Sequence, residues 1–366
     1  MTDGGSVLRD VRRELRAAAR GAVFVLELMP MLPSRFLERL SPTPRREAIV
    51  FPTADGDAAA DVFRPAAGGP YPGIAVSLGV VPAGLEHPQI PRLGRALARA
   101  GFVALVYWSP AMHDRRLEPD DAGRLAAAFE HLLRLPAVDA RRCGLLGTCV
   151  GASFALLAAT QPSIRDRVAF VVAFAPYASL ETFVGAIASR TRAADGGRRA
   201  WPLDPLTWAV YVRTLTSTLG PDEAELLRAE FASPDRTAGA APPTGLGNDA
   251  LAVRHLLAPL PYEETAAATA ALPAELVQRL REMSPLAFLD DLRAPLVVVG
   301  HDRDDFVIPV DESRLLRDSL AHRPGFHYTE FGLFEHADPT KRRLAPHRLL
   351  FELGRFARYV HPVLRV

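Results

Sequence analysis

The sequence predicts an α/β protein with a doubly wound, mostly parallel β-sheet. Short apolar runs alternate with stretches of helical periodicity over residues 71–176 and again over residues 294–366. Such alternation is typical of parallel sheets covered by helices on both faces. The apolar runs are bounded by Gly or Pro, as expected for strands buried on both faces. A length of 366 residues, 49% of them hydrophobic, allows one large core with an added unit.

The individual elements follow from local patterns. Residues 46–65 contain two short strand patterns around the turn TADGD. Further strands are predicted over residues 71–81, 102–108, 142–147, 167–176, 294–300 and 325–331. Apolar spacings of three and four residues predict helices over 90–101, 120–135, from 150 onward, over 311–320 and from about Pro346 onward.

Residues 177–290 interrupt this alternation. They contain helical patterns but no convincing series of strands, and the stretch is too long for a connecting loop. We therefore expect a mostly helical cap inserted into a core of residues 46–176 and 291–366. An N-terminal helical segment of residues 1–45 precedes the core.

The N-terminal segment carries apolar residues at helical spacing, which predicts an amphipathic helix. These are Leu8, Val11, Leu15, Ala18, Ala22 and Val25. We interpret the helix as packing on its own domain or on a neighbouring subunit, the second arrangement giving a homodimer. A helix lying on a membrane surface is the alternative. Glu27 interrupts the following apolar stretch, which argues against a signal peptide.

Charge and cysteine usage limit the partners and the compartment. A formal net charge of +1 gives no electrostatic case for nucleic acid. No apolar run is long enough to predict a transmembrane span. Cys143 and Cys149 lie on one strand and turn, a poor geometry for a disulfide, so we expect a reducing, cytoplasmic compartment. No zinc-ligand spacing is present, and we expect no metal or other cofactor.

Cys149 lies in the stretch GTCVGASF, between a predicted strand and a predicted helix. A nucleophile on such a tight turn needs small neighbours, which Gly147 and Gly151 provide. The N–H groups at the helix start favour a thiolate, and the Val150 N–H can bind an oxyanion. The alternative is that Cys149 is a small buried apolar residue.

A cysteine nucleophile needs a base, and the base needs an orienting acid. Asp304 and Asp305 follow the strand predicted over 294–300, and His336 follows the strand predicted over 325–331. Because open parallel sheets build their sites at the carboxyl ends of strands, we expect these groups to meet Cys149 there.

Three motifs of this chain resemble those of the α/β-hydrolases. LLGTCVGAS resembles the nucleophile elbow, GHDRDDFVIP the acid loop and FEHADP the histidine loop. The resemblance implies the α/β-hydrolase fold and a triad of Cys149, His336 and Asp305. Asp305 fits the family spacing to a following Ile and Pro, but the stretch is one residue longer than usual, so Asp304 stays a second candidate. Cysteine nucleophiles occur in dienelactone hydrolase-like enzymes and in polyhydroxyalkanoate synthase-like acyltransferases.

The same resemblance implies that Val80 or Val81 provides the second oxyanion donor, after Val150. Tyr107 and Trp108 end a strand and Trp208 adds apolar bulk to the cap, so all three are candidate substrate-binding residues.

These residues predict a hydrolase that cleaves a carboxylic ester, thioester or lactone of a small-molecule acyl substrate, most similar to the dienelactone hydrolase-like branch. An acyltransferase that passes the same S-acyl group to an alcohol, amine or thiol is the first alternative. A non-catalytic relative that binds a small ligand under the cap is the second.

Overall fold

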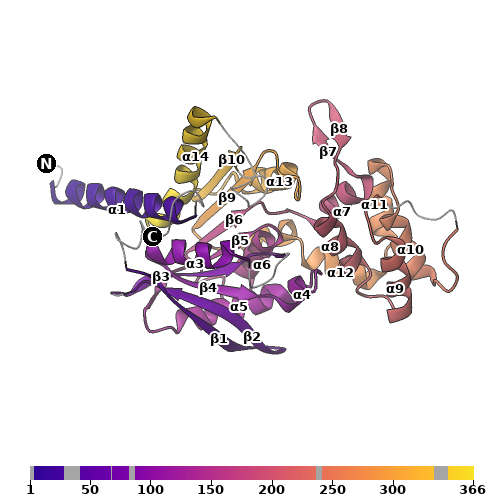
Figure 1. Cartoon of the computed structure of the whole chain (residues 1–366), viewed down its shortest axis with the longest axis horizontal. Coiled ribbons are helices and arrows are strands. Elements are labelled where there is room, and N and C mark those ends of the chain that lie inside the picture. The colour runs from indigo at the N-terminus through magenta and orange to yellow at the C-terminus, as the bar shows by residue number, and fades with distance from the viewer. Residues whose placement is uncertain (1–3, 29–41, 67, 82–86, 236–240, 334–344) are drawn as a thin grey trace.

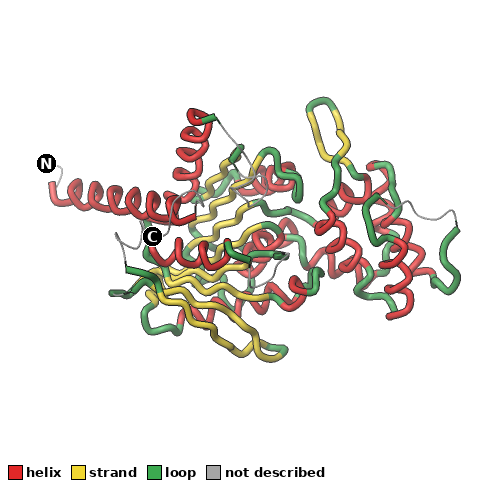
Figure 2. The backbone as a smooth tube through the Cα atoms, viewed as in Figure 1, coloured by secondary structure: helices red, strands yellow, loops and turns green. Residues whose placement is uncertain are grey.

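The computed structural model describes residues 4–28, 42–66, 68–81, 87–235, 241–333 and 345–366. It contains an eight-stranded sheet in the order β1-β2-β4-β3-β5-β6-β9-β10 (Figures 1 and 2). β2 pairs antiparallel with β1 and β4, and the other neighbours are parallel. The strands are β1 (Arg45–Thr53), β2 (Gly56–Arg64), β3 (Tyr71–Ser77), β4 (Val103–Trp108), β5 (Val138–Thr148), β6 (Phe170–Phe174), β9 (Leu296–Asp302) and β10 (Phe326–Phe331). The predicted sheet is confirmed.

Helices cover both faces of the sheet because successive strand residues point to opposite sides. Leu105 of β4 packs in one apolar layer, and its neighbours Ala104 and Val106 pack in the other. Helices of the first layer are α5 (Asp120–Leu133), α6 (Val150–Thr160) and α13 (Val310–Leu320). Helices of the second layer are α1 (Gly4–Leu28), α3 (Gln89–Arg99) and α14 (Pro346–Leu364). All eleven residues of α6 are buried, so the helix that follows Cys149 is held from every side.

The N-terminal helix α1 packs against α3 and α14 of the same chain (Figure 1). Its packed face differs from the predicted stripe, because Val11 and Leu15 are exposed whereas Ala17 and Phe24 are buried. The helix is thus rotated about its axis relative to the prediction, and a buried charge pair explains this rotation. Glu27 is 5% exposed and lies 3.1 Å from the guanidinium of Arg99 on α3, which turns that side of the helix inward. Association into a homodimer stays a prediction.

The chain between β6 and β9 folds mostly into helices beside the sheet (Figures 1 and 2). Its elements are α7 (Leu180–Ser189), β7 (Thr191–Ala194), β8 (Gly197–Ala200), α8 (Pro205–Leu215), α9 (Pro221–Glu230), α10 (Asn248–Leu257), α11 (Tyr262–Ala270), α12 (Ala274–Glu282) and the 3₁₀-helix η2 (Pro285–Asp291). We call residues 177–290 the insert. The β7–β8 hairpin is absent from the sequence prediction, because its two strands are short and pair only with each other. Within the described ranges, no helix combines the length and apolarity that a bilayer span requires.

Candidate active site

Cys149 lies on a strained turn between β5 and α6. Its backbone has φ 56° and ψ −139°, a region that side-chain-bearing residues rarely occupy. Two backbone hydrogen bonds hold it there: the Cys149 N–H donates to Phe174 O at 2.9 Å, and Cys149 O accepts from the Ala152 N–H at 2.9 Å. The surroundings therefore maintain a conformation that the residue would not adopt by itself, as is common for groups at functional sites.

The two flanking glycines are required by the close approach of backbones. A Cβ added to Gly147 would lie 2.2 Å from Gly151 O, and one added to Gly151 would lie 2.4 Å from both Gly79 N and Ser77 O. These contacts are too short for any side chain. The elbow is thus pressed against the loop that follows β3, in which Gly79 itself adopts φ +74°.

A cavity of about 210 Å³ lies between the elbow and the insert. Cys149, Val150 and Val80 form its wall on the sheet side. The opposite wall includes the α7 residues Leu180, Phe183, Val184 and Ile187. These four residues are not among the predicted substrate-binding residues, although their helical spacing directly after a strand end was a usable signal. Because most of the lining side chains are apolar, the cavity fits an apolar group next to the thiol.

Asp305 is fully buried in the loop that follows β9, whereas its neighbour Asp304 is exposed. We call residues 302–309 the acid loop. The Asp305 Oδ1 accepts the N–H groups of Val307 at 2.7 Å and Ile308 at 3.0 Å, which fixes the carboxylate within a tight turn. Of the two candidates, Asp305 is therefore the buried and anchored carboxylate, and its role as the orienting acid stays a prediction.

His301, at the end of β9, is hydrogen-bonded to the acid loop. It is fully buried, and its Nε2 lies 3.0 Å from Ile308 O and 3.5 Å from Asp305 Oδ2. Because a carbonyl oxygen only accepts, the Nε2 carries the proton. The Nδ1 has no hydrogen-bond partner among the described residues.

His336 lies outside the described residues, so its role as the base stays a prediction. The strand before it, β10, pairs in parallel with β9, and Phe331 at its end is in register with Asp302. The chain therefore leaves the sheet next to the acid loop.

No family model matches this chain. Among solved structures, it is similar to a bacterial brefeldin A esterase, described as a homologue of human hormone sensitive lipase. The TM-score is 0.53 with 18% identity over 97% of this chain and 86% of that one. It is also similar to the acylaminoacyl peptidase of Pyrococcus horikoshii, with a TM-score of 0.52 and 15% identity over 91% of this chain and 44% of that one. The chain has the α/β-hydrolase fold.

A curated relative from Bradyrhizobium matches part of the chain. It is described as a probable 2-oxo-3-(5-oxofuran-2-ylidene)propanoate lactonase, and the two are 39% identical over 92 residues. The match covers 20% of this chain and 36% of the relative's length.

Within this α/β-hydrolase fold, the loop after β3 brings Val80 to the cavity and directs Val81 elsewhere. Val80 packs with the apolar cluster of the insert, whereas Val81 packs in the layer of α1, α3 and α14. A hydrogen bond of 3.0 Å from Thr148 Oγ1 to Leu78 O ties this loop to the end of β5. Val150 opens α6, where the first N–H groups of a helix have no intrahelical acceptor. Val150 and Val80 therefore both border the cavity, and the role of oxyanion donor stays a prediction for them.

The three aromatic residues predicted to bind substrate do not line the cavity. Tyr107 is buried on the sheet, and its hydroxyl donates to Asp121 Oδ1 at 3.1 Å. Trp108 donates its indole N–H to Asp61 Oδ2 at 3.1 Å. Trp208 is 1% exposed inside the insert and donates to a backbone carbonyl of the insert, at Phe231. Strand-end position and apolar bulk could not reveal these polar partners, which hold each side chain outside the lining of the cavity.

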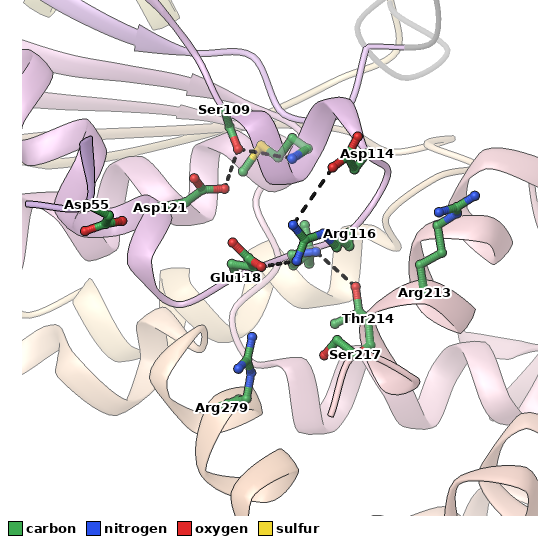
Figure 3. A network of polar contacts seen from close by, with 12 residues as sticks. Asp55, Ser109, Asp114, Arg116, Glu118, Asp121, Arg213, Thr214, Ser217 and Arg279 are labelled. Atoms are coloured by element: carbon green, nitrogen blue, oxygen red, sulfur yellow. Dashed lines mark hydrogen bonds and ion pairs between the residues drawn. The ribbon is translucent and has the colours of Figure 1, made fainter. Parts of the chain in front are cut away.

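Polar contacts join the loop around Arg116 to Thr214 of the insert (Figure 3). The Leu117 N–H donates to Thr214 Oγ1 of α8 at 3.1 Å, and both residues line the cavity. Arg116 pairs with Glu118 on the same loop, which follows the short helix α4 (Pro110–His113). The cavity wall therefore depends on both units being docked.

The second cysteine occupies a different environment. Cys143 is fully buried on β5, and its Sγ lies 3.2 Å from Asp139 O. Burial raises the pKa of the Cys143 thiol to about 11. Within the described part of the chain, no group of three or more His, Cys, Asp or Glu residues is arranged to hold a metal ion.

Proposed function

We propose that this protein is a hydrolase that cleaves a carboxylic ester, thioester or lactone through a Cys149 acyl-enzyme. One observation carries the proposal: Cys149 is held in a strained backbone conformation at a strand-to-helix turn, and it borders an apolar cavity. A cysteine that served only for packing would need neither the strain nor the cavity.

In the proposed reaction, the Cys149 sulfur attacks the acyl carbonyl carbon while His336 takes the thiol proton. The N–H groups of Val150 and Val80 stabilise the oxyanion that forms. His336 then protonates the leaving group, and the C–O or C–S bond to it breaks. Water, activated by His336, hydrolyses the S-acyl intermediate. Asp305 orients the imidazole and stabilises its charged form throughout. No metal or other cofactor takes part in this scheme.

The apolar cavity supports a small acyl substrate with an apolar chain. The name of the Bradyrhizobium relative supports including lactones, and the cysteine supports assignment to the dienelactone hydrolase-like branch. Both cysteines are free thiols, which supports a reducing, cytoplasmic compartment.

The test is a panel of p-nitrophenyl esters, an acyl thioester and an unsaturated γ-lactone, assayed with wild type and three variants. Cys149→Ala should abolish turnover, and Asp305→Asn should lower kcat by roughly 10²- to 10⁴-fold. Asp304→Asn is the matched control and should retain activity, because that side chain is exposed.

Mass spectrometry of quenched reactions should show one acyl group on the peptide that contains Cys149. Full activity of Cys149→Ala would refute the mechanism. Negligible free acid combined with turnover that depends on an added alcohol, amine or thiol would establish an acyltransferase instead.

A further inference from the structure

The acid loop is held by side chains of the insert as well as by its own hydrogen bonds. Arg192 of β7 donates from Nη1 to Asp305 O at 3.1 Å. Trp201, which follows β8, donates from Nε1 to Phe306 O at 3.0 Å. Two consecutive carbonyls next to the proposed catalytic acid are therefore bound by the hairpin.

Trp201 is held in place by burial and by backbone pairing, and Arg192 carries a charge opposite to that of the acid loop. Trp201 is 2% exposed, and its backbone N–H donates to Arg190 O at 2.8 Å, across the base of the hairpin. Its ring also lies 6.4 Å, between centroids, from the ring of Phe183, which lines the cavity. Burial lowers the pKa of Arg192, as does repulsion from Arg199, and the negative charges of the acid loop oppose that change. The Arg192 guanidinium is thus a cation placed beside an acidic loop.

The geometry points to Arg192 and Trp201 as positioning residues that set the orientation of Asp305 and thereby couple the insert to catalysis. The inference rests on the proposed function. The Asp305 carboxylate is pinned to the N–H groups of Val307 and Ile308, so its direction follows the peptide planes of the acid loop. The Phe306 carbonyl shares a peptide plane with the Val307 N–H, and the Asp305 carbonyl belongs to the plane immediately before it. A rotation of either plane would move the carboxylate relative to the base, and misplacement of about 1 Å is sufficient to slow catalysis.

The loop is consequently held from two sides. His301 holds Ile308 O from the sheet, and the hairpin holds the two earlier carbonyls from the insert. The proposed acid is correctly oriented only when the insert is docked on the sheet.

The experiment compares Trp201→Phe and Arg192→Gln with Arg199→Gln, using p-nitrophenyl butyrate. Trp201→Phe keeps an aromatic ring and removes the indole donor. Arg199 pairs in register with Arg192 on β8 and is exposed, so its substitution makes the same change of charge without touching the acid loop. We expect each of the first two variants to lower kcat by roughly 10- to 100-fold with KM unchanged, and the control to match wild type.

Two further readouts separate positioning from a loss of folding. A misoriented Asp305 stabilises the imidazolium less, so the acidic limb of the kcat/KM profile should move to lower pH in both variants. In an Asp305→Asn background, Trp201→Phe and Arg192→Gln should cause no further loss, because they act through that carboxylate. Circular dichroism and thermal unfolding confirm that each variant is folded.

A full additional loss in the Asp305→Asn background would overturn the inference, as would a rise in KM with kcat unchanged. If Asp305→Asn is damaging but both hairpin variants behave as wild type, the inference fails and the proposed function stands. If Cys149→Ala and Asp305→Asn retain full activity, the proposed function itself fails, and the inference fails with it.

Discussion

Glu312 is a buried carboxyl whose ionisation should act against folding. It lies in the first turn of α13, is 5% exposed, and its Oε2 accepts the N–H groups of Ala178 at 3.0 Å and Ser179 at 3.3 Å. Burial raises the pKa of Glu312 from 4.5 to about 7, against the opposite effect of those hydrogen bonds. Ala178 and Ser179 lie where the chain enters the insert, so Glu312 binds the backbone at the start of the insert.

The sign of the effect follows from the direction of the pKa shift. The native state binds the Glu312 proton more tightly than the unfolded state does. Its contribution to stability is therefore complete below the unfolded pKa of 4.5 and is lost as the pH rises through about 7. A rise in pKa of this size corresponds to a change of roughly 3 kcal/mol in the free energy of unfolding, since a tenfold change in an equilibrium constant is about 1.4 kcal/mol.

Glu312→Gln removes the ionisation and keeps the size of the side chain and a carbonyl acceptor for the two N–H groups. The unfolding free energy of the variant, relative to that of wild type, should therefore increase by roughly 3 kcal/mol between pH 4.5 and pH 8. Urea unfolding of both proteins at four pH values, followed by circular dichroism, measures this difference.

Glu330→Gln provides a control of opposite sign. The Arg314 guanidinium, at 2.8 Å, lowers the pKa of Glu330, so that carboxylate contributes stability above its unfolded pKa and loses it as the pH falls. Its variant should be more destabilised relative to wild type at pH 7 than at pH 4. A difference between Glu312→Gln and wild type that stays constant from pH 4.5 to pH 8 would refute the reasoning.

Four further outcomes are expected. Limiting iodoacetamide near pH 7 should alkylate Cys149 at the cavity before Cys143, because Cys143 is fully buried and its pKa is raised. Peptide mass mapping measures the labelling, and equal labelling of the two cysteines would contradict this expectation. Gly151→Ala should cost roughly 1–3 kcal/mol and most of the activity, because the new Cβ meets backbone atoms at 2.4 Å. Gly123→Ala on α5, where an added Cβ meets nothing within 4 Å, should gain up to about 1 kcal/mol in the same urea titration. Because the cavity is mostly apolar, kcat/KM should rise by up to about fourfold per methylene from acetyl to longer acyl esters, and a flat series would argue against acyl binding there.

The parallel strands and the elbow could be predicted from sequence because their signals are local. Continuous apolar runs mark strands buried on both faces, and Cys149 lies between two glycines at positions where the turn leaves no room for a side chain. The packed face of α1 could not be predicted in the same way. The predicted stripe through Val11 and Leu15 is apolar, but the face that packs contains Glu27, whose partner Arg99 lies on another helix.

The aromatic residues show the same limit at the site. Tyr107 and Trp108 end a strand at the correct edge of the sheet, but each ring has a carboxylate partner that determines its direction, at Asp121 and Asp61. Such partners are distant in sequence and carry no spacing signal. The α7 residues that do line the cavity had such a signal, through helical periodicity directly after a strand.

The hairpin contacts explain why the residues proposed to orient the catalytic acid could not be predicted from the sequence. Asp305 could be proposed because orienting a base requires a carboxylate, at a spacing that the motif fixes. Arg192 and Trp201 lie 113 and 105 residues from the atoms they bind, and those atoms are backbone carbonyls, which every residue type supplies. A motif can therefore identify a group whose chemistry needs a particular side chain. It cannot identify the residues that orient this group through the backbone, and these become visible only once the insert is seen docked on the acid loop.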